Sequence, residues 1–270
     1  MRRALLAMSA AMLPILGHAA PERQDFGQPE VTFSASDFAR EAYDILQPSN
    51  VDATGSVITI TYDDDPRIPS SLIWRAPITG STLVQSGTDW QLTSAQTSAG
   101  LTVGASSIRG MMDGGEITWR DMEIDLVNGS ISAVVSGSNG LDDAGRVTVA
   151  SIGQVSKSLT VAPYNPNLCC MPTPHVYELG TFEVTLSELT LTDAGATTLM
   201  QGLGINSNSL GRPVVEMFKG TSLGDITLTE YYVAEAGTFV ASVPEPSTWA
   251  LTLLGLTGVA AAARARRHTA

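Results

Sequence analysis

The amino-acid sequence predicts a mainly β protein, an antiparallel sandwich or flattened barrel with two short helices. Three observations lead to this prediction. Between its two ends the chain is rich in Ser, Thr, Gly, Val and Ile, which favour strands and turns over long surface helices. Many short stretches alternate apolar and polar residues, as half-buried strands do. Turn sequences separate these stretches, and Asn128-Gly129 is the strongest hairpin signal among them.

The first part of the body is expected to hold a leader and one helix. Residues 20–35 read as a poorly ordered leader. The segment Ser36–Gln47 then repeats apolar residues at helical spacing, which gathers them on one face. Pro48 is expected to end this helix, because proline disrupts a helix interior.

Strand patterns follow. The longest is Gly115–Val127, and Asn128-Gly129 should return the chain antiparallel to it as Ser130–Ser136. Gly145–Ile152 and Val155–Val161 are expected to form another hairpin across Gly153-Gln154. The remaining strand candidates are Ser56–Tyr62, Leu72–Trp74, Ser81–Gln85, Asp89–Leu92, Leu101–Val103, Thr181–Thr192, Val214–Phe218, Leu223–Tyr231 and Thr238–Ala241.

Two further local features are predicted in the second half. The parity of the apolar residues in Thr181–Thr192 shifts between Leu186 and Leu189, which predicts a bulge around Ser187-Glu188. Asp193–Leu203 is predicted to be a short helix with Thr192 or Asp193 as its N-cap and Gly204 as its stop.

The N-terminus has the features of a secretory signal peptide. Arg2 and Arg3 form a charged region, and the apolar run Ala4–Leu16 follows. Gly17-His18-Ala19 offers small residues at the two positions that a signal peptidase recognises. We therefore expect residues 1–19 to be removed after Ala19, which leaves residues 20–243 as the exported body.

The C-terminal segment 244–270 combines three elements in a fixed order. Pro244-Glu245-Pro246 comes first, an uncharged run from Trp249 to Ala263 follows, and Arg264, Arg266 and Arg267 end the segment. As a helix the run would span about 22 Å, less than the ~30 Å hydrocarbon core of a bilayer. The order predicts a short transmembrane segment with its arginines in the cytoplasm.

This tail resembles the PEP-CTERM sorting signal of exopolysaccharide-producing bacteria. The resemblance covers about a tenth of the chain and leaves the family of the body open. It implies that Pro244, Glu245 and Pro246 are the sorting motif, read by an exosortase-like processing enzyme. It also implies an inner-membrane intermediate, then a final place in the outer envelope or extracellular matrix, with exopolysaccharide as a candidate partner.

The charge of the body argues against polyanionic partners such as nucleic acid and anionic lipid surfaces. The terminal segments hold five of the 15 basic residues but only one of the 27 acidic residues, Glu245. Residues 20–243 therefore carry 10 basic and 26 acidic residues, a formal charge of −16. Such a surface repels nucleic acid and anionic lipid, and it favours solubility.

Cys169 and Cys170 are adjacent, and they are the only cysteines of the chain. The exported compartment is oxidising, so a disulfide between the two neighbours is one reading. Free thiols, intermolecular pairing and a soft-metal site with His175 stay open as alternatives. Two adjacent thiolates reach one ion poorly, which counts against the metal site.

Other chemistry finds little support in the sequence, which indicates no catalytic residue, metal ligand or cofactor. His175 is the only histidine of the body, and no Gly-x-Ser-x-Gly elbow or zinc-ligand spacing occurs. Asp63-Asp64-Asp65 lacks the spacing of a calcium loop.

Three functional hypotheses follow. The first is a non-enzymatic exported protein with a structural or adhesive role in the envelope or matrix. The second is a secreted polysaccharide hydrolase with paired carboxylates, and the third is a small-ligand binding module. A deep pocket lined by Trp74, Trp90 or Trp119 would favour the last two, and a filled core the first. Whether the protein is an enzyme stays undecided, with the non-enzymatic reading preferred.

Overall fold

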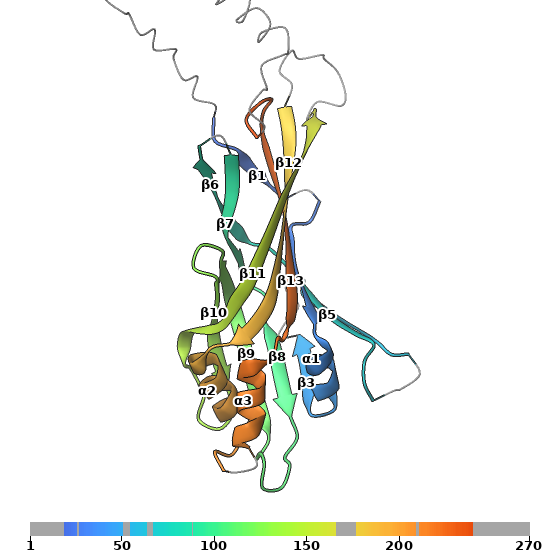
Figure 1. Cartoon of the computed structure of the whole chain (residues 1–270), viewed down its shortest axis with the longest axis vertical. Coiled ribbons are helices and arrows are strands. Elements are labelled where there is room, and N and C mark those ends of the chain that lie inside the picture. The colour runs from blue at the N-terminus through green and yellow to red at the C-terminus, as the bar shows by residue number, and fades with distance from the viewer. Residues whose placement is uncertain are drawn as a thin grey trace, which may run out of the picture.

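The computed structural model describes residues 19–25, 27–50, 55–63, 67–87, 89–165, 177–208 and 211–239. Within these residues, thirteen strands form one antiparallel sheet that is nearly closed into a barrel (Figure 1). Three α-helices gather at one end of the barrel. The predicted fold class, a mainly β sandwich or flattened barrel, is confirmed, with three short α-helices instead of two.

Strand lengths differ widely, from three residues in β1 to twenty in β11. Most predicted strands are present with longer bounds, and the β9–β10 hairpin across Asn128-Gly129 is confirmed. The strands are β1 (Glu22–Gln24), β2 (Glu30–Ala35), β3 (Leu46–Asn50), β4 (Val57–Thr61), β5 (Ser71–Pro77), β6 (Gly80–Ser86), β7 (Asp89–Thr97), β8 (Leu101–Ala105), β9 (Gly115–Asp125), β10 (Ser130–Gly137), β11 (Gly145–Tyr164), β12 (Tyr177–Leu191) and β13 (Gly224–Glu235).

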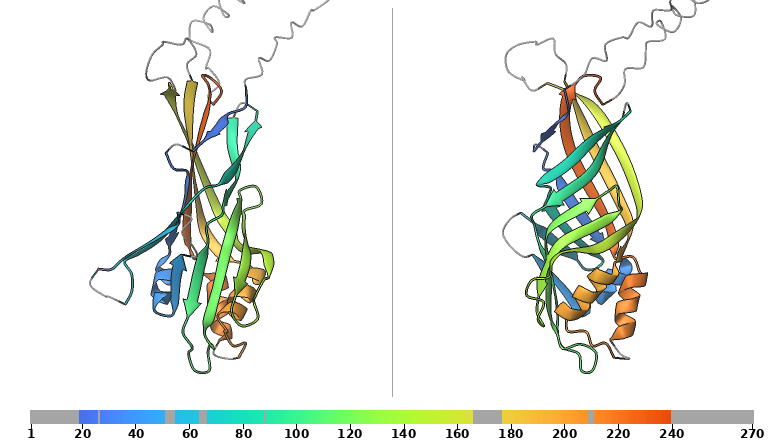
Figure 2. Two further views of the ribbon diagram at one scale, coloured as in Figure 1. Left: turned by 180° about the vertical axis from the view of Figure 1, so that it is seen from behind. Right: turned by 90° about the vertical axis from the view of Figure 1, so that its left-hand side faces the viewer.

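The sheet forks at two strands. Its main path runs β3-β8-β9-β10-β11-β12-β13-β2-β5-β4. One edge of β9 pairs with β8 along its first half and with β7 along its second half. One edge of β13 likewise pairs with β2 and then with β1. The barrel has a helical end and an opposite end, and β11 stops and β12 begins at the opposite end (Figure 2).

The ladder between β11 and β12 is the longest pairing, and it overturns one prediction. Gly145–Ile152 and Val155–Val161 do not form a hairpin; both belong to β11, which pairs with β12 from Ala150↔Leu191 to Tyr164↔Tyr177. Gly153 lies opposite Glu188, whose side chain and carbonyl fill the space beside it. A Cβ at position 153 would collide with Glu188, so this glycine serves close approach and not a turn.

The predicted bulge around Ser187-Glu188 is wrong in form. Apolar parity does change there, since Leu186 and Leu189 are both buried. Glu188 adopts a positive φ of 57°, but the register on either side is unbroken, with Ile152↔Leu189 and Gln154↔Ser187. Both strands therefore change their inward face together, without an inserted residue.

The first helix is shorter than predicted. α1 covers Asp37–Glu41, with Ser36 as N-cap through a 3.2 Å bond from the Ala39 amide, and a 3₁₀ turn continues to Asp44. Leu46 and Gln47 belong to β3 instead, and Pro48 lies inside that strand, opposite Val103. β3 is an edge strand of the main path, where a residue without an amide donor is tolerated.

Of the other two helices, one was predicted and one was predicted to be a strand. α2 (Asp193–Gly202) is confirmed with Thr192 as its N-cap, because the Thr192 hydroxyl accepts from the Gly195 amide at 3.0 Å. The predicted strand Val214–Phe218 is wrong, since it lies in α3 (Arg212–Gly220). Val215 and Phe218 are buried at helical spacing, and a proline in the first turn suits a helix start.

The start of the body is also better ordered than predicted. β1 and β2 occupy residues 22–24 and 30–35 of the expected leader. β2 lies between β13 and β5 in the sheet. Because side chains alternate along β2, Val31 points into the barrel, and its side chain is only 2% exposed. Thr238 and Phe239, expected in a last strand, lie in the turn after β13.

The core is one cluster that runs through the barrel and includes its helical end. Leu186, Leu203 and Leu228 are buried there, and α2 packs against β9, β10, β11 and β12. Close helix–strand packing depends on Gly195, whose hydrogen atoms face the Val149 backbone.

We predict that Gly195→Ala destabilises the protein by about 2 kcal/mol or more, because the new methyl group would meet the Val149 carbonyl oxygen. Gly220→Ala is the matched helix control, since the space beside Gly220 is open. It should change stability by less than about 1 kcal/mol. Chemical denaturation of both variants checks this, and equal stabilities would contradict the packing argument.

Candidate functional site

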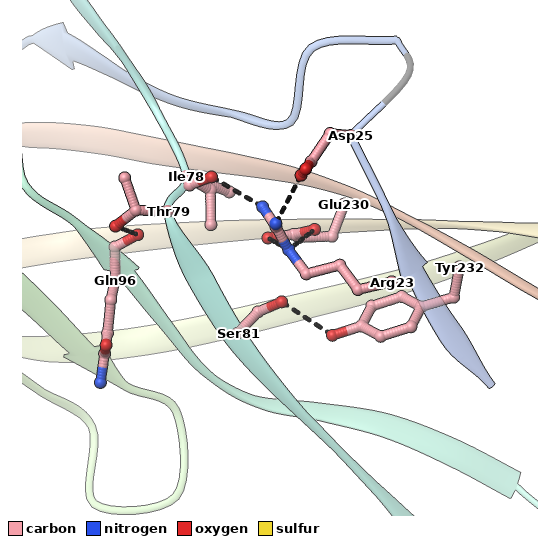
Figure 3. Close-up of polar contacts among 8 residues, drawn as sticks. All are labelled: Arg23, Asp25, Ile78, Thr79, Ser81, Gln96, Glu230 and Tyr232. Atoms are coloured by element: carbon pink, nitrogen blue, oxygen red, sulfur yellow. Dashed lines mark hydrogen bonds and ion pairs between the residues drawn. The ribbon is translucent and has the colours of Figure 1, made fainter. Parts of the chain in front are cut away.

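A charged pair, the partly buried Arg23 and the buried Glu230, lies inside the barrel (Figure 3). Glu230 on β13 is 0% exposed. Arg23 on β1 donates from Nε to both carboxylate oxygens, at 3.1 and 3.3 Å. The register pairs Arg23 with Tyr232. Because side chains alternate along a strand, Glu230 and Tyr232 face the same side of β13.

Arg23 holds three parts of the chain together. Besides Glu230, its guanidinium donates to the Asp25 carboxylate at 2.6 Å and to the Ile78 carbonyl at 2.6 Å. Nearby, the hydroxyls of Ser81 and Tyr232 are 2.7 Å apart. These contacts link β1, β13 and the start of β6, so the polar cluster closes one side of the barrel.

Burial controls the ionisation of this cluster. It raises the pKa of Glu230, while the charge of Arg23 and hydrogen bonds from Ser81, Arg23 and the Tyr231 backbone act in the opposite direction. Burial is also the main cause of the raised pKa of Tyr232. The carboxylate of Glu230 therefore depends on Arg23 as its compensating charge.

A cavity of about 280 Å³ lies beside this cluster, between β7 and the β11–β12 ladder. The rings of Phe182 and Tyr232 meet edge to face at 5.6 Å, and Phe182 meets Phe239 at 5.8 Å. We call this 280 Å³ cavity the Trp90 cavity. Its lining is Asp89, Trp90, Gln91, Leu92, Lys157, Ser158, Leu159, Phe182, Val184 and Phe239.

An apolar groove of about 320 Å³ lies at the helical end. Met217 and Ile45 on its rim are 51% and 40% exposed. We call it the methionine groove. Its lining is Phe38, Glu41, Ala42, Ile45, Leu46, Met111, Met112, Ile205, Val214, Met217 and Phe218.

A third hollow, of about 120 Å³, contains two carboxylates, Asp121 and Glu123. Glu123 pairs with Arg146 at 3.6 Å, and the Arg146 guanidinium also donates to the Asp121 carbonyl at 3.0 Å. Asp121 has a positive φ of 48°. The ion pair gives Glu123 a structural partner.

Several predicted site residues lie outside the described residues: Pro244, Glu245, Pro246, Cys169, Cys170 and His175. Of the tryptophans, Trp74 is buried in the core and Trp119 packs against it, while Trp90 lines a cavity. In the described part of the chain, no group of three His, Cys, Asp or Glu residues could hold a metal ion.

Sequence reasoning missed Arg23, Glu230 and Lys157. Glu230 and Lys157 each stand on the same face of the sheet as buried apolar side chains. A charged residue at an otherwise apolar position of a strand is the sequence signal that could have identified them. Arg23 gave none, because its importance comes from pairing with a residue 207 positions away.

The body leads to the tail through a fixed turn. The buried Glu178 carboxylate accepts from the amides of Gly237 at 3.1 Å and Phe239 at 2.6 Å. Residues 242–267, just beyond, match the family described as the PEP-CTERM protein-sorting motif.

The tail carries a PEP-CTERM motif. This motif implies export through the envelope to the cell surface and processing by an exosortase-like enzyme. No curated protein and no solved structure matches the chain. The helices of the described residues are all too short or too polar to cross a membrane; the predicted segment Trp249–Ala263 lies outside those residues.

We predict that Arg23→Gln lowers stability by about 2–3 kcal/mol above the raised pKa of Glu230, because it leaves a buried carboxylate uncompensated. A carboxyl with a raised folded pKa binds more protons in the native state, so its contribution to stability falls as pH rises through that pKa.

The loss in Arg23→Gln should therefore shrink as pH falls towards the ordinary glutamate pKa of about 4.3. The double variant Arg23→Gln/Glu230→Gln should lack this pH dependence. Thermal unfolding over a pH series measures both, and a loss independent of pH would sink the assignment.

Proposed function

We propose that the protein is a non-enzymatic structural or adhesive component of the outer envelope or extracellular matrix. The observation that carries this proposal is the arrangement of the two ends. β13 ends, and the chain leaves towards its sorting tail, at the end of the barrel opposite the helices (Figure 1). The methionine groove at the helical end would then face away from the membrane.

The proposed route has three steps. Signal peptidase would cut after Ala19 and leave residues 20–243 followed by the tail. The tail, residues 244–270, would hold an inner-membrane intermediate until the exosortase-like enzyme acts at Pro244-Glu245-Pro246. The body would then reach its final layer, with exopolysaccharide as a candidate partner. The charge of −16 on the body supports solubility there.

A second candidate, a small-ligand binding module, is favoured by the Trp90 cavity, which combines aromatic walls with polar side chains. The hydrolase alternative would need a pair of free carboxylates. Asp121 and Glu123 line one hollow, but Glu123 already forms an ion pair with Arg146. This ion pair makes the hydrolase hypothesis the less supported of the two.

Changing Pro244, Glu245 and Pro246 together to Ala should keep the protein unprocessed in the inner membrane, because the sorting sequence is lost. Fractionation and immunoblotting of the native host measure this. Asp142→Ala in an exposed turn is the control and should sort normally. Normal release of the triple variant would show that the motif does not direct sorting here.

Met217→Lys should weaken retention of the protein in the matrix or adhesion of the cells, since it puts a charge on the rim of an apolar groove. Val127→Lys is the matched control, because Val127 is 72% exposed and lies in the β9–β10 turn. Equal retention of the two variants would count against an adhesive role for the groove.

Cys169 and Cys170 should be oxidised to each other in the exported protein, since the chain offers no other cysteine. Such a ring closes almost no loop, so changing both to Ser should cost little global stability. Non-reducing peptide mapping decides the pairing. Two freely alkylated thiols, or a covalent dimer, would refute it.

A further inference from the structure

Lys157 interrupts an apolar face. On β11, Val155, Lys157 and Leu159 share one side of the strand because side chains alternate. Their partners on β12 are Leu186, Val184 and Phe182, all at most 3% exposed. The register therefore puts Lys157 on the same face of the sheet as these buried side chains, although Lys157 itself is exposed.

The ammonium group of Lys157 uses only one of its hydrogen-bond donors within the described residues. It crosses the barrel and donates to the Leu92 carbonyl on β7 at 3.2 Å. An ammonium group has three donors, and no carboxylate in the described part of the chain forms an ion pair with this one. Lys219, the other lysine, pairs with Asp193. A lysine without a carboxylate partner among the described residues is unexpected in a body with a charge of −16.

The walls around this cation are apolar. Leu92, Leu159, Val184 and the edge-to-face pair Phe182–Phe239 surround the Trp90 cavity. Its volume of about 280 Å³ suits a small molecule. Lys157 is exposed, so its ammonium group lies at the mouth of the cavity, which opens to solvent. Asp89 on the same lining would repel a second negative charge.

We propose that the Trp90 cavity binds a small amphipathic monoanion. Its apolar body contacts Phe182, Phe239 and Leu159, and its single anionic group accepts hydrogen bonds from the Lys157 ammonium. The charge-assisted bond selects anions over neutral molecules of the same shape, and the apolar aromatic walls contribute the remaining affinity.

The test uses the full chain in lipid nanodiscs and photoreactive octanoate, a diazirine-bearing fatty acid, with the matching photoreactive octanol as the neutral probe. Cross-linked peptides are mapped by mass spectrometry. Octanoate should label peptides that contain Trp90, Leu159 or Phe182. In Lys157→Gln this labelling should fall about tenfold, the effect of losing one charged hydrogen bond, and octanol labelling should stay unchanged.

Two further variants act as controls. Lys157→Arg keeps the charge and should retain most of the octanoate labelling, and Lys219→Gln should label like the wild type. The proposal is overturned if Lys157→Gln labels as strongly as the wild type. It is equally overturned if wild-type labelling is confined to methionine-groove peptides, or if octanol labels the cavity as well as octanoate does.

Discussion

The continuous register of the β11–β12–β13 ladder is the constraint on which the rest of the structure depends. β12 pairs with β11 from Tyr177 to Leu191 and with β13 from Tyr177 to Leu186. This register alone decides which side chains of the three strands face the interior. It turns Glu230 inward and puts Lys157 on the same face as the buried Val184. It also makes β11 and β12 change their inward face together where Gly153 meets Glu188.

The two ends of the barrel consequently differ in character. At the helical end, α2 and α3 complete an apolar core, and their close packing needs glycine where a backbone approaches. The opposite end is more polar, because Arg23, Glu230 and Tyr232 form a polar cluster inside it and Lys157 donates to the Leu92 carbonyl there. This polar end also carries the exit towards the sorting tail, whereas the methionine groove lies at the other end.

Alternation and turn chemistry were enough to predict the fold class, most strands and the capped helix α2. They failed where a pairing partner decides the outcome. Gly153-Gln154 looks like a turn by composition, but β12 extends alongside and keeps it in a strand. Pro48 looks like a helix stop, but an edge position accommodates it in β3. The tail motif was predictable because it is local, whereas the Arg23–Glu230 pair joins positions 207 residues apart.

We propose that both terminal segments only deliver the barrel, which then works at the cell surface without them. The most direct test is the intact mass, with both terminal sequences, of the protein recovered from the surface of its native host. We expect a chain that begins at Ala20 and has lost the apolar run Ala250–Ala263. A surface protein that still carries both terminal segments would contradict it.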